Sequence, residues 1–464
     1  MRNRGRKFAL LFPAGMLAVG LVALVWAIGI GSSEANEGAM QNCPQAGKWA
    51  ISVWNGDDAT DPDQAFATCD EGGVAVAYSI DPDTQQWSRW FADRPDVSNL
   101  TTLDDMQGVL ALGAAEAPAS PTPSPPTTPT VPDLAAGWTK IEPGGDTICS
   151  LGTPYAYYVH PGTVNRLAVY FQGGGACWND FTCSNPDMYF DNAVDESDNP
   201  ENWTGGIGDL DNPDNPFKDW FLVFIPYCTA DVHWGNNTQT YTIGDEDTTL
   251  YHKGFVNFSA VLDWIQANFE QPEKIFVSGC SAGSYGSIMG APHIHEAYPD
   301  VPFYHLGDAG AGVITDDFFA GGFPNWDVTD SRPDWIPAPN GSWIEVSELA
   351  DMYIALANYY SDDRWSQYNT AYDVDQIFFY GAMGGTAADW SDLMLASIQE
   401  IQDNAPNFHS YTAPGAIHCI TGNDIFYTRE VEGVKFSDWV DAMVNDEAWD
   451  DVMCTDCETD PEAQ

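Results

Sequence analysis

Short apolar runs alternate with amphipathic segments from Gly137 onward. Apolar residues at three- and four-residue spacing in the longer segments predict helices, most clearly over 254–269 and 389–402. Strands that alternate with helices predict an α/β domain with a mostly parallel sheet and helices on both faces. The apolar runs that we assign to strands are Tyr155–His160, Asn165–Gln172, Trp220–Tyr227, Lys274–Gly279, Val301–Asp308 and Gln376–Ala382, and 407–413 is a further candidate.

A different pattern precedes this domain. Residues 41–113 contain short alternating runs separated by Gly, Asp and Pro, which predict a small β-rich module of antiparallel strands. Its tryptophans fit two interpretations: they fill a small core, or they form an aromatic surface that holds sugar rings or a partner. These tryptophans are Trp49, Trp54, Trp87 and Trp90.

Residues 114–133 are rich in Pro and Thr and predict an extended linker, so a second domain occupies 134–464. At the N-terminus, four basic residues within the first seven precede an apolar run over 8–30. This pattern predicts an export signal in residues 1–33. The run is also long enough to span a bilayer as an uncleaved anchor. We expect an extracytoplasmic protein, either secreted or anchored at the cell surface.

The net charge of the chain limits the classes of partner that it can bind. The chain has 16 Lys and Arg against 68 Asp and Glu, for a net charge of −52. Nucleic-acid binding needs the opposite sign and is excluded. The charge predicts a solvated acidic surface that suits solubility or high salt. The Asp-rich segments 195–203 and 208–217 lack the glycine and terminal Glu of an EF-hand loop, so calcium binding stays open.

The ten cysteines fit an oxidising compartment. A single Cys-x-x-Cys near the C-terminus favours a small disulfide loop over structural zinc. The pairs that we propose are Cys43–Cys69, Cys149–Cys228, Cys177–Cys183, Cys280–Cys419 and Cys454–Cys457.

The stretch "IFVSGCSAGSYGS", residues 275–287, indicates a nucleophile. A buried strand here runs into Gly279-Cys280-Ser281-Ala282-Gly283, a Gly-x-Ser-x-Gly pattern, and a helix follows. Glycines leave room for the sharp bend that places a serine above the sheet edge. The N–H group of the next residue, Ala282, lies at the N-terminus of this helix. The partial positive charge there favours an oxyanion that forms beside Ser281.

The remaining groups of an acyl-transfer site have candidates in the same domain. Gly174 and Gly175 follow a predicted strand, so their backbone N–H groups, with that of Ala282, form a candidate oxyanion hole. His418, just past a Gly turn after the last strand, is the favoured base among five histidines. Asp308 and Asp373 are both candidates for the acid. The other histidines considered are His293, His295, His305 and His409.

These motifs together resemble the pectin acetylesterase/Notum family of α/β-hydrolases. The resemblance rests on blocks in the expected order between 138 and 439, which include "VYFQGGGACWNDFTC", "VSGCSAGSYGS", "AYDVDQI" and "AIHC". It implies an α/β-hydrolase fold with Ser281 as nucleophile, Asp373 as acid and His418 as base. It also implies the oxyanion groups named above and the pairs Cys149–Cys228 and Cys177–Cys183.

The family resemblance implies hydrolysis of carboxylic esters without a metal or organic cofactor. Acetyl esters of polysaccharides are the first expected substrate, and a neutral glycan suits the acidic chain better than pectin. The alternatives are a long-acyl carboxylesterase of the Notum or lipase type, or a surface binding protein with a vestigial site. Two departures from the family pattern, Trp178 beyond Cys177 and Ser284 in place of a glycine, border the expected acyl pocket.

Overall fold

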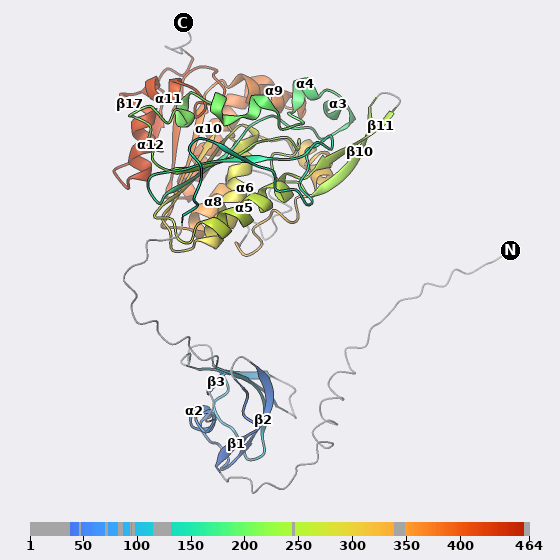
Figure 1. The fold of residues 1–464 in the computed structure, drawn as a ribbon, viewed down its shortest axis with the longest axis vertical. Helices are drawn as coiled ribbons and strands as arrows, with labels where there is room; N and C mark the ends of the chain where they lie inside the picture. The colour runs from blue at the N-terminus through green and yellow to red at the C-terminus, as the bar shows by residue number, and fades with distance from the viewer. Residues whose placement is uncertain are drawn as a thin grey trace, which may run out of the picture. The chain divides into compact units, whose positions relative to one another are not determined.

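The computed structural model describes residues 38–45, 48–69, 73–81, 87–92, 94, 98–114, 131–243, 246–337 and 349–458. It divides into two compact units, Met1–Thr127 and Thr128–Gln464 (Figure 1). The predicted export signal or anchor at 1–33 lies outside the described residues. None of the described helices combines the length and apolar character needed to cross a bilayer.

The N-terminal unit is built on a five-stranded antiparallel sheet, which confirms the predicted β-rich module. The strand order is β1-β2-β5-β3-β4. A short helix, α2, covers one face, where the rings of Phe66 and Trp90 lie 4.6 Å apart. The elements are β1 Ala39–Gln41, β2 Trp49–Asn55, α2 Pro62–Phe66, β3 Val74–Ile80, β4 Trp87–Phe91 and β5 Gly108–Gly113.

The second unit contains a nine-stranded sheet in the order β18-β15-β14-β13-β12-β8-β9-β7-β6. Its strand pairs are parallel except for β6 with β7 and β7 with β9, so the predicted mostly parallel sheet is confirmed. Its strands are β6 Thr139–Ile141, β7 Tyr157–His160, β8 Leu167–Phe171, β9 Phe221–Ile225, β12 Ile275–Cys280, β13 Phe303–Asp308, β14 Arg364–Thr370, β15 Phe408–Ala413 and β18 Val452–Met453. Two small hairpins lie outside it, β10 Asn237–Ile243 with β11 Glu246–His252, and β16 Glu430–Val431 with β17 Val434–Lys435.

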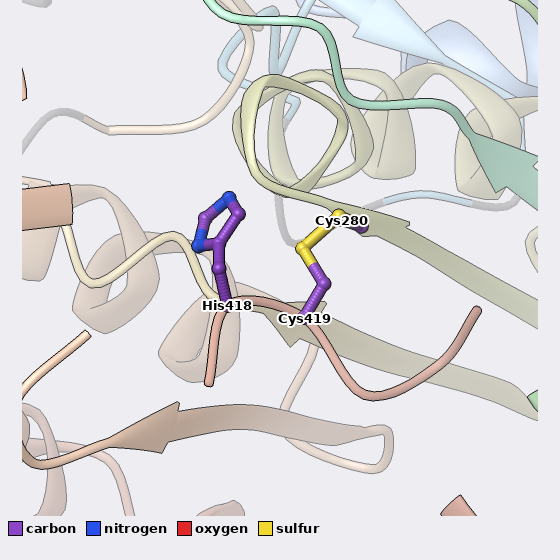
Figure 2. A group of neighbouring side chains, drawn as sticks. All are labelled: Cys280, His418 and Cys419. Carbon is purple, nitrogen blue, oxygen red and sulfur yellow. A yellow bond between two sulfur atoms is a disulfide. The ribbon is translucent and has the colours of Figure 1, made fainter. Parts of the chain in front are cut away.

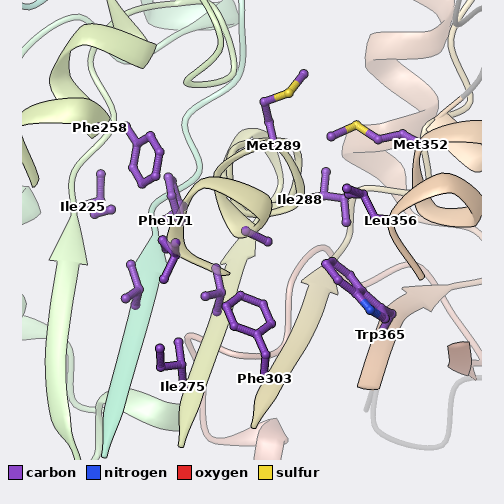
Figure 3. Close-up of a cluster of buried hydrophobic side chains, with 14 of the residues drawn as sticks. Phe171, Ile225, Phe258, Ile275, Ile288, Met289, Phe303, Met352, Leu356 and Trp365 are labelled. Atoms are coloured by element: carbon purple, nitrogen blue, oxygen red, sulfur yellow. The ribbon is translucent and has the colours of Figure 1, made fainter. Parts of the chain in front are cut away.

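Helices cover both faces of this sheet, because both faces of its strands are apolar. Along β8, Val169 packs into one buried cluster and Tyr170 into the other. The first cluster joins the strands to α5, α6, α8 and α10 (Figure 3), and the second joins them to α11 and α12. The α-helices of the unit are α3 Asp180–Cys183, α4 Pro186–Tyr189, α5 Gly254–Asn268, α6 Ala282–Ala297, α7 Asp316–Gly321, α8 Leu349–Tyr359, α9 Val374–Ala382, α10 Trp390–Asn404, α11 Ile425–Thr428 and α12 Phe436–Val444. Short 3₁₀ turns are η1 Glu196–Asp198, η2 Pro200–Asn202, η3 Gly206–Gly208, η4 Phe323–Trp326 and η6 Ala387–Asp389.

One predicted strand is wrong. The run Gln376–Ala382 belongs to helix α9, because the Asp373 side chain accepts hydrogen bonds from the next turn of backbone and starts a helix there. The strand in this region is β14, whose polar residues Ser366 and Asn369 are buried and hydrogen-bonded. A strand with satisfied polar groups in the core does not stand out as an apolar run.

Five neighbouring parallel strands, β15, β14, β13, β12 and β8, have their carboxyl ends at one edge of the sheet. The segments that follow these strands carry the predicted site residues. Open α/β sheets bind ligands at this edge. The topology therefore brings the segments after these strands, which lie between residues 172 and 421, together at this edge of the sheet.

Candidate active site

Ser281 occupies the sharp turn between β12 and α6. Its backbone has φ 57° and ψ −122°, which is strained for a residue with a side chain. A Cβ on Gly279 would collide with the carbonyl of Gly283, and one on Gly283 with the carbonyl of Phe171. The two glycines of the Gly-x-Ser-x-Gly pattern are therefore required by the close packing of strand and helix around the serine.

The glycine loop after β8 lies beside this turn. A Cβ on Gly173 would touch Cys280 and Ser281, and a Cβ on Gly175, which has φ 72°, would collide with the carbonyl of Tyr189. Within the described part of the chain, the backbone N–H groups of Gly174, Gly175 and Ala282 donate to no protein acceptor. The sequence predicts that these same N–H groups form the oxyanion hole. Gly175 and Ala282 line one cavity together with Ser281.

Asp373 and His418 form a direct pair. His418 Nδ1 lies 2.9 Å from both carboxylate oxygens of Asp373, and the Asp373 side chain is fully buried. Gln376 holds the same carboxylate, because its backbone N–H donates to Oδ1 at 3.0 Å and its Nε2 to Oδ2 at 3.1 Å. The carboxylate is thus fixed in one orientation toward the imidazole.

Burial of His418 opposes a charged imidazolium and by itself lowers its pKa. The hydrogen bond and the negative charge of Asp373 outweigh this effect, with smaller contributions from Asp375 and Asp308, so the pKa of His418 is raised. A histidine that gains stability on protonation beside a carboxylate is suited to act as a general base. Nδ1 faces the carboxylate, which leaves Nε2 for a proton from a serine.

Asp308, the other candidate acid, contacts the loop beyond the histidine. Its Oδ2 accepts hydrogen bonds from the Ile420 N–H at 2.9 Å, the Thr421 N–H at 2.8 Å and the Thr421 hydroxyl at 2.6 Å. Burial raises the pKa of Asp308 to about 6. The structure therefore places Asp373 beside the His418 imidazole. Asp308 instead binds the backbone that follows His418.

A disulfide links the two halves of the site. Cys280 and Cys419 are bonded, and Figure 2 shows the bond beside the His418 ring. All the described cysteines are paired, in the five pairs proposed from the sequence. Cys177–Cys183 closes the segment directly after the glycine loop.

The other four candidate histidines have partners elsewhere in the fold. His295 pairs with Asp363 at 2.8 Å and His409 with Asp451 at 3.3 Å. His293 and His305 form hydrogen bonds with Ser331 and Ser287. None of the four lines the two cavities at Ser281.

Two cavities meet at Ser281 and His418. One is narrow and apolar, about 80 Å³, and the other is a polar groove of about 800 Å³. The apolar cavity is lined mainly by Ala176, Trp178, Val232, Trp234, Tyr285, Val313, Ile314, Phe318, Phe323, Trp326, Phe379, Met383 and Trp390. The groove is bordered by the glycine loop, Asp187, Asp191, Asn192, Asp198, Asn199, Trp203 and Asp375. An ester bound at Ser281 would thus have separate surroundings for its acyl and alcohol parts.

Sequence reasoning missed the residues that support this arrangement. Gln376 bridges Asp373, Asn369 and the backbone of Ala311. The Asp-x-x-Gln spacing of a helix start was a usable signal for Gln376. No local sequence pattern indicated a role for Thr421, because its hydrogen-bond partners lie on strands that are distant in the sequence.

Among the residues that the structure describes, two groups of side chains have the composition of metal ligands, and both are used within the protein. The first contains His418 with Cys280 and Cys419, whose sulfurs are joined to each other. The second contains Asp373, Asp375 and His418, in which Asp373 already accepts hydrogen bonds from the imidazole, from Gln376 and from backbone. Neither group offers a vacant set of donor atoms.

Comparison with known proteins identifies the family of this chain. The model of the pectinacetylesterase family matches residues 140–321. The zebrafish (Danio rerio) inactive palmitoleoyl-protein carboxylesterase notum1b is 31% identical over 114 residues, which are 24% of this chain and 76% of that protein. This chain belongs to the pectin acetylesterase/Notum family.

Other members of the pectin acetylesterase/Notum family match over a smaller share of their length. Palmitoleoyl-protein carboxylesterase NOTUM of the planarian Schmidtea mediterranea is 30% identical over 148 residues, 30% of this chain and 27% of that protein. Human NOTUM is 24% identical over 172 residues, 35% of this chain and 34% of that protein. The match thus spans about a third or less of these two relatives.

The crystal structure of the Wnt deacylase Notum from Drosophila shares the fold of this chain, with a TM-score of 0.51 at 14% identity. The match covers 67% of this chain and 94% of that one. The α/β-hydrolase fold inferred from the resemblance is therefore confirmed. The family names are those of carboxylic ester hydrolases, so the chain is a member of an esterase family.

Proposed function

We propose that this protein is a serine carboxylic ester hydrolase with Ser281, His418 and Asp373 as its catalytic triad. One observation carries the proposal: Ser281, on a strained turn, shares two cavities with a histidine whose other ring nitrogen is held by a buried carboxylate. The strain at Ser281 is otherwise costly and is typical of a nucleophile.

The reaction follows from these positions. His418 Nε2 takes the hydroxyl proton as Ser281 Oγ attacks the acyl carbonyl, and Asp373 stabilises the resulting imidazolium. The N–H groups of Gly174, Gly175 and Ala282 stabilise the tetrahedral oxyanion. The intermediate collapses to an acyl-serine when the alcohol leaves with the proton from His418. Water, deprotonated by His418, then attacks the acyl-serine and releases the acid.

The polar groove supports a carbohydrate as the alcohol part. Its volume of about 800 Å³ and its mixture of amide, carboxylate and aromatic side chains, including Asn192, Asn199 and Trp203, suit a sugar chain. Asp187, Asp191 and Asp198 in the same groove, on a chain of charge −52, repel a polyuronate. We therefore propose acetyl esters of a neutral polysaccharide as the first substrate class.

The apolar cavity favours a second candidate, a longer acyl chain. An acetyl group needs only the part of the cavity next to Ser281, whereas the lining continues past Trp178 to Phe323 and Trp326. Several relatives are named palmitoleoyl-protein carboxylesterases. A long-acyl carboxylesterase of this kind would use the same triad.

A binding protein with a vestigial site is the remaining alternative, and one relative is itself named inactive. The His418–Asp373 pair and the strained Ser281 argue against it here, because neither feature serves binding alone. The proposal therefore assigns catalysis to this chain on its own residues.

We further propose an extracytoplasmic location, secreted or surface-anchored through residues 1–33, because five disulfides require oxidising conditions. In this arrangement 41–113 is an accessory module, 114–133 a linker and 134–464 the catalytic domain.

Initial rates on p-nitrophenyl acetate, butyrate, octanoate and palmitate test the proposal, with Ser281→Ala as the blank. Rates that fall with chain length would support a deacetylase, and acetylated glycans would be assayed next. A preference for octanoate or palmitate would support the long-acyl candidate. Turnover that survives in Ser281→Ala, or no turnover of any ester, would contradict the proposed triad.

A further inference from the structure

The N-terminal unit has one sheet face that no described element covers. Trp90, Ala77 and Ala111 lie opposite each other across β4, β3 and β5 on the face that α2 packs against. Side chains alternate between faces along a strand, so the neighbouring residues point to the other side. The tryptophans of this unit are accordingly divided, with Trp54 and Trp90 in the core and Trp49 and Trp87 exposed.

We call this second surface the outer aromatic face. Its exposed side chains include Trp87 at 61%, Trp49 at 51% and Ile51 at 43%. The strand register places Ile51, Leu110 and Tyr78 opposite one another, and Ile80 opposite Trp87. The register places Trp49, Ile51, Val53, Val76, Tyr78, Ile80, Trp87, Arg89, Phe91, Leu110 and Leu112 on this face.

Aromatic rings form a row across this face. The ring centroids of Trp49 and Tyr78 are 6.1 Å apart, and those of Tyr78 and Phe91 are 6.2 Å apart. The rings come from β2, β3 and β4, so the row crosses the sheet rather than following one strand. A contiguous group of exposed apolar side chains on one face of a sheet marks an interaction site.

Charge decides which partner the face fits. Strands β2, β3, β4 and β5 contain no Asp or Glu, in a chain that has 68 of them. The only charged residue on these strands is Arg89, opposite Tyr78. A cationic partner would find no carboxylate on the face, and a polyanion is repelled by the net charge of −52. Arg89 is a single cation among apolar side chains on the outer aromatic face, and the net charge of the chain opposes a polyanion, so the face suits an uncharged ligand.

We propose that the outer aromatic face binds a neutral polysaccharide. A pyranose ring presents a flat array of C–H groups on one side, which packs against the face of Trp or Tyr, while its hydroxyl groups stay in water. A row of rings from three strands contacts several consecutive sugars and needs no charged group. Through the linker, this binding raises the local concentration of polymer at the catalytic unit, and this role alone rests on the proposed esterase function.

The test uses the full chain carrying Ser281→Ala, so that binding is measured without catalysis. Protein is mixed with microcrystalline cellulose or insoluble acetylated xylan, and the fraction that stays in solution is measured over a range of polymer concentrations. We expect retention on at least one polymer, and a drop of about tenfold or more in partition when Trp49→Ala and Trp87→Ala are combined, because two stacking contacts are lost.

Three control variants make the result specific. Trp49→Tyr with Trp87→Tyr keeps the rings and should keep most of the retention. Tyr359→Ala removes an aromatic side chain that is 47% exposed on the catalytic unit and should leave retention unchanged. Circular dichroism of the double alanine variant shows whether the unit remains folded.

Several results would overturn the proposal. No retention on either polymer would do so, as would equal retention of the double alanine variant. Self-association that disappears in the double alanine variant would identify a second copy as the occupant, and binding to phosphatidylcholine vesicles would identify a lipid surface. Loss of esterase activity would not bear on this result, because the assay contains no active enzyme.

Discussion

The residue before Ser281 is covalently bonded to the residue after His418 through the Cys280–Cys419 disulfide. These cysteines are 139 residues apart in sequence; Cys280 is the last residue of β12, and Cys419 lies in the loop that follows β15. The bond therefore limits how far the proposed nucleophile and base can separate. Asp308 holds the same loop through Thr421, so a covalent and a hydrogen-bonded restraint act together.

Removing the disulfide should reduce both stability and rate. We expect Cys280→Ala with Cys419→Ala to lower the free energy of unfolding by about 2–5 kcal/mol, because a long loop is released in the unfolded chain. The kcat for p-nitrophenyl acetate should fall, because the loop that carries His418 is no longer bonded to the residue before Ser281. Cys43→Ala with Cys69→Ala is the matched control and should leave kcat unchanged, since this pair lies in the N-terminal unit. An unchanged kcat in the first variant would argue against the anchoring role.

Asp373→Asn should reduce kcat by about 10³- to 10⁴-fold, since the imidazole loses its orientation and the support for its charged form. Asp373 also raises the pKa of His418, so its loss lowers that pKa. The acid limb of kcat/KM should then move to lower pH. Asp363→Asn, in the His295 pair outside the site, is the control and should leave the pH profile unchanged.

Asp308→Asn tests whether Asp308 holds the loop that carries His418 in place. Loss of the charge should allow the loop to shift, and displacements of about 1 Å near a reacting group can cost about 10²-fold in rate. We expect kcat to fall by about ten- to 100-fold with little change in KM for small esters. The negative charge of Asp308 also raises the pKa of His418, so the acid limb should again move to lower pH.

A companion pair of variants separates position from charge. Thr421→Ser keeps the hydroxyl that donates to Asp308 and should retain most of the rate, whereas Thr421→Val should not. If Asp308→Asn lowers stability but leaves both kcat and the pH profile as in the wild type, Asp308 is a structural residue only.

Salt should stabilise the protein. A net charge of −52 makes the folded chain repel itself, and dissolved ions screen this repulsion. We expect the melting temperature, and the rate on a neutral ester, to rise from low to molar NaCl. Differential scanning calorimetry and initial rates measure the two effects, with KCl as a check on ion identity. A flat response would show that the acidic residues serve solubility alone.

Much of the fold could be predicted because its strands are short apolar runs with strong flanking signals. The turn at Ser281 is local, so the Gly-x-Ser-x-Gly pattern was enough to place it between strand and helix. β14 escaped prediction because its buried polar groups are satisfied by distant partners such as the His305 carbonyl. The run after Asp373 was assigned wrongly because helix capping, rather than apolar content, decides its structure.

The site was only partly predictable for the same reason. Asp308 ends β13 and Asp373 comes shortly after β14, so a local pattern does not separate the two. The difference between them is set by sheet order and by the path of the loop that carries His418, which are long-range properties. The division of the tryptophans between core and surface in the N-terminal unit likewise depends on strand register.

Covalent trapping of the nucleophile tests the central claim most directly. The full chain is treated with a fluorophosphonate ester, and the modified residue is located by peptide mass spectrometry. The account predicts one adduct, on Ser281, with loss of esterase activity in proportion to labelling and no adduct in Ser281→Ala. Esterase activity that survives complete labelling of Ser281, or an adduct that forms on another residue as activity is lost, would contradict it.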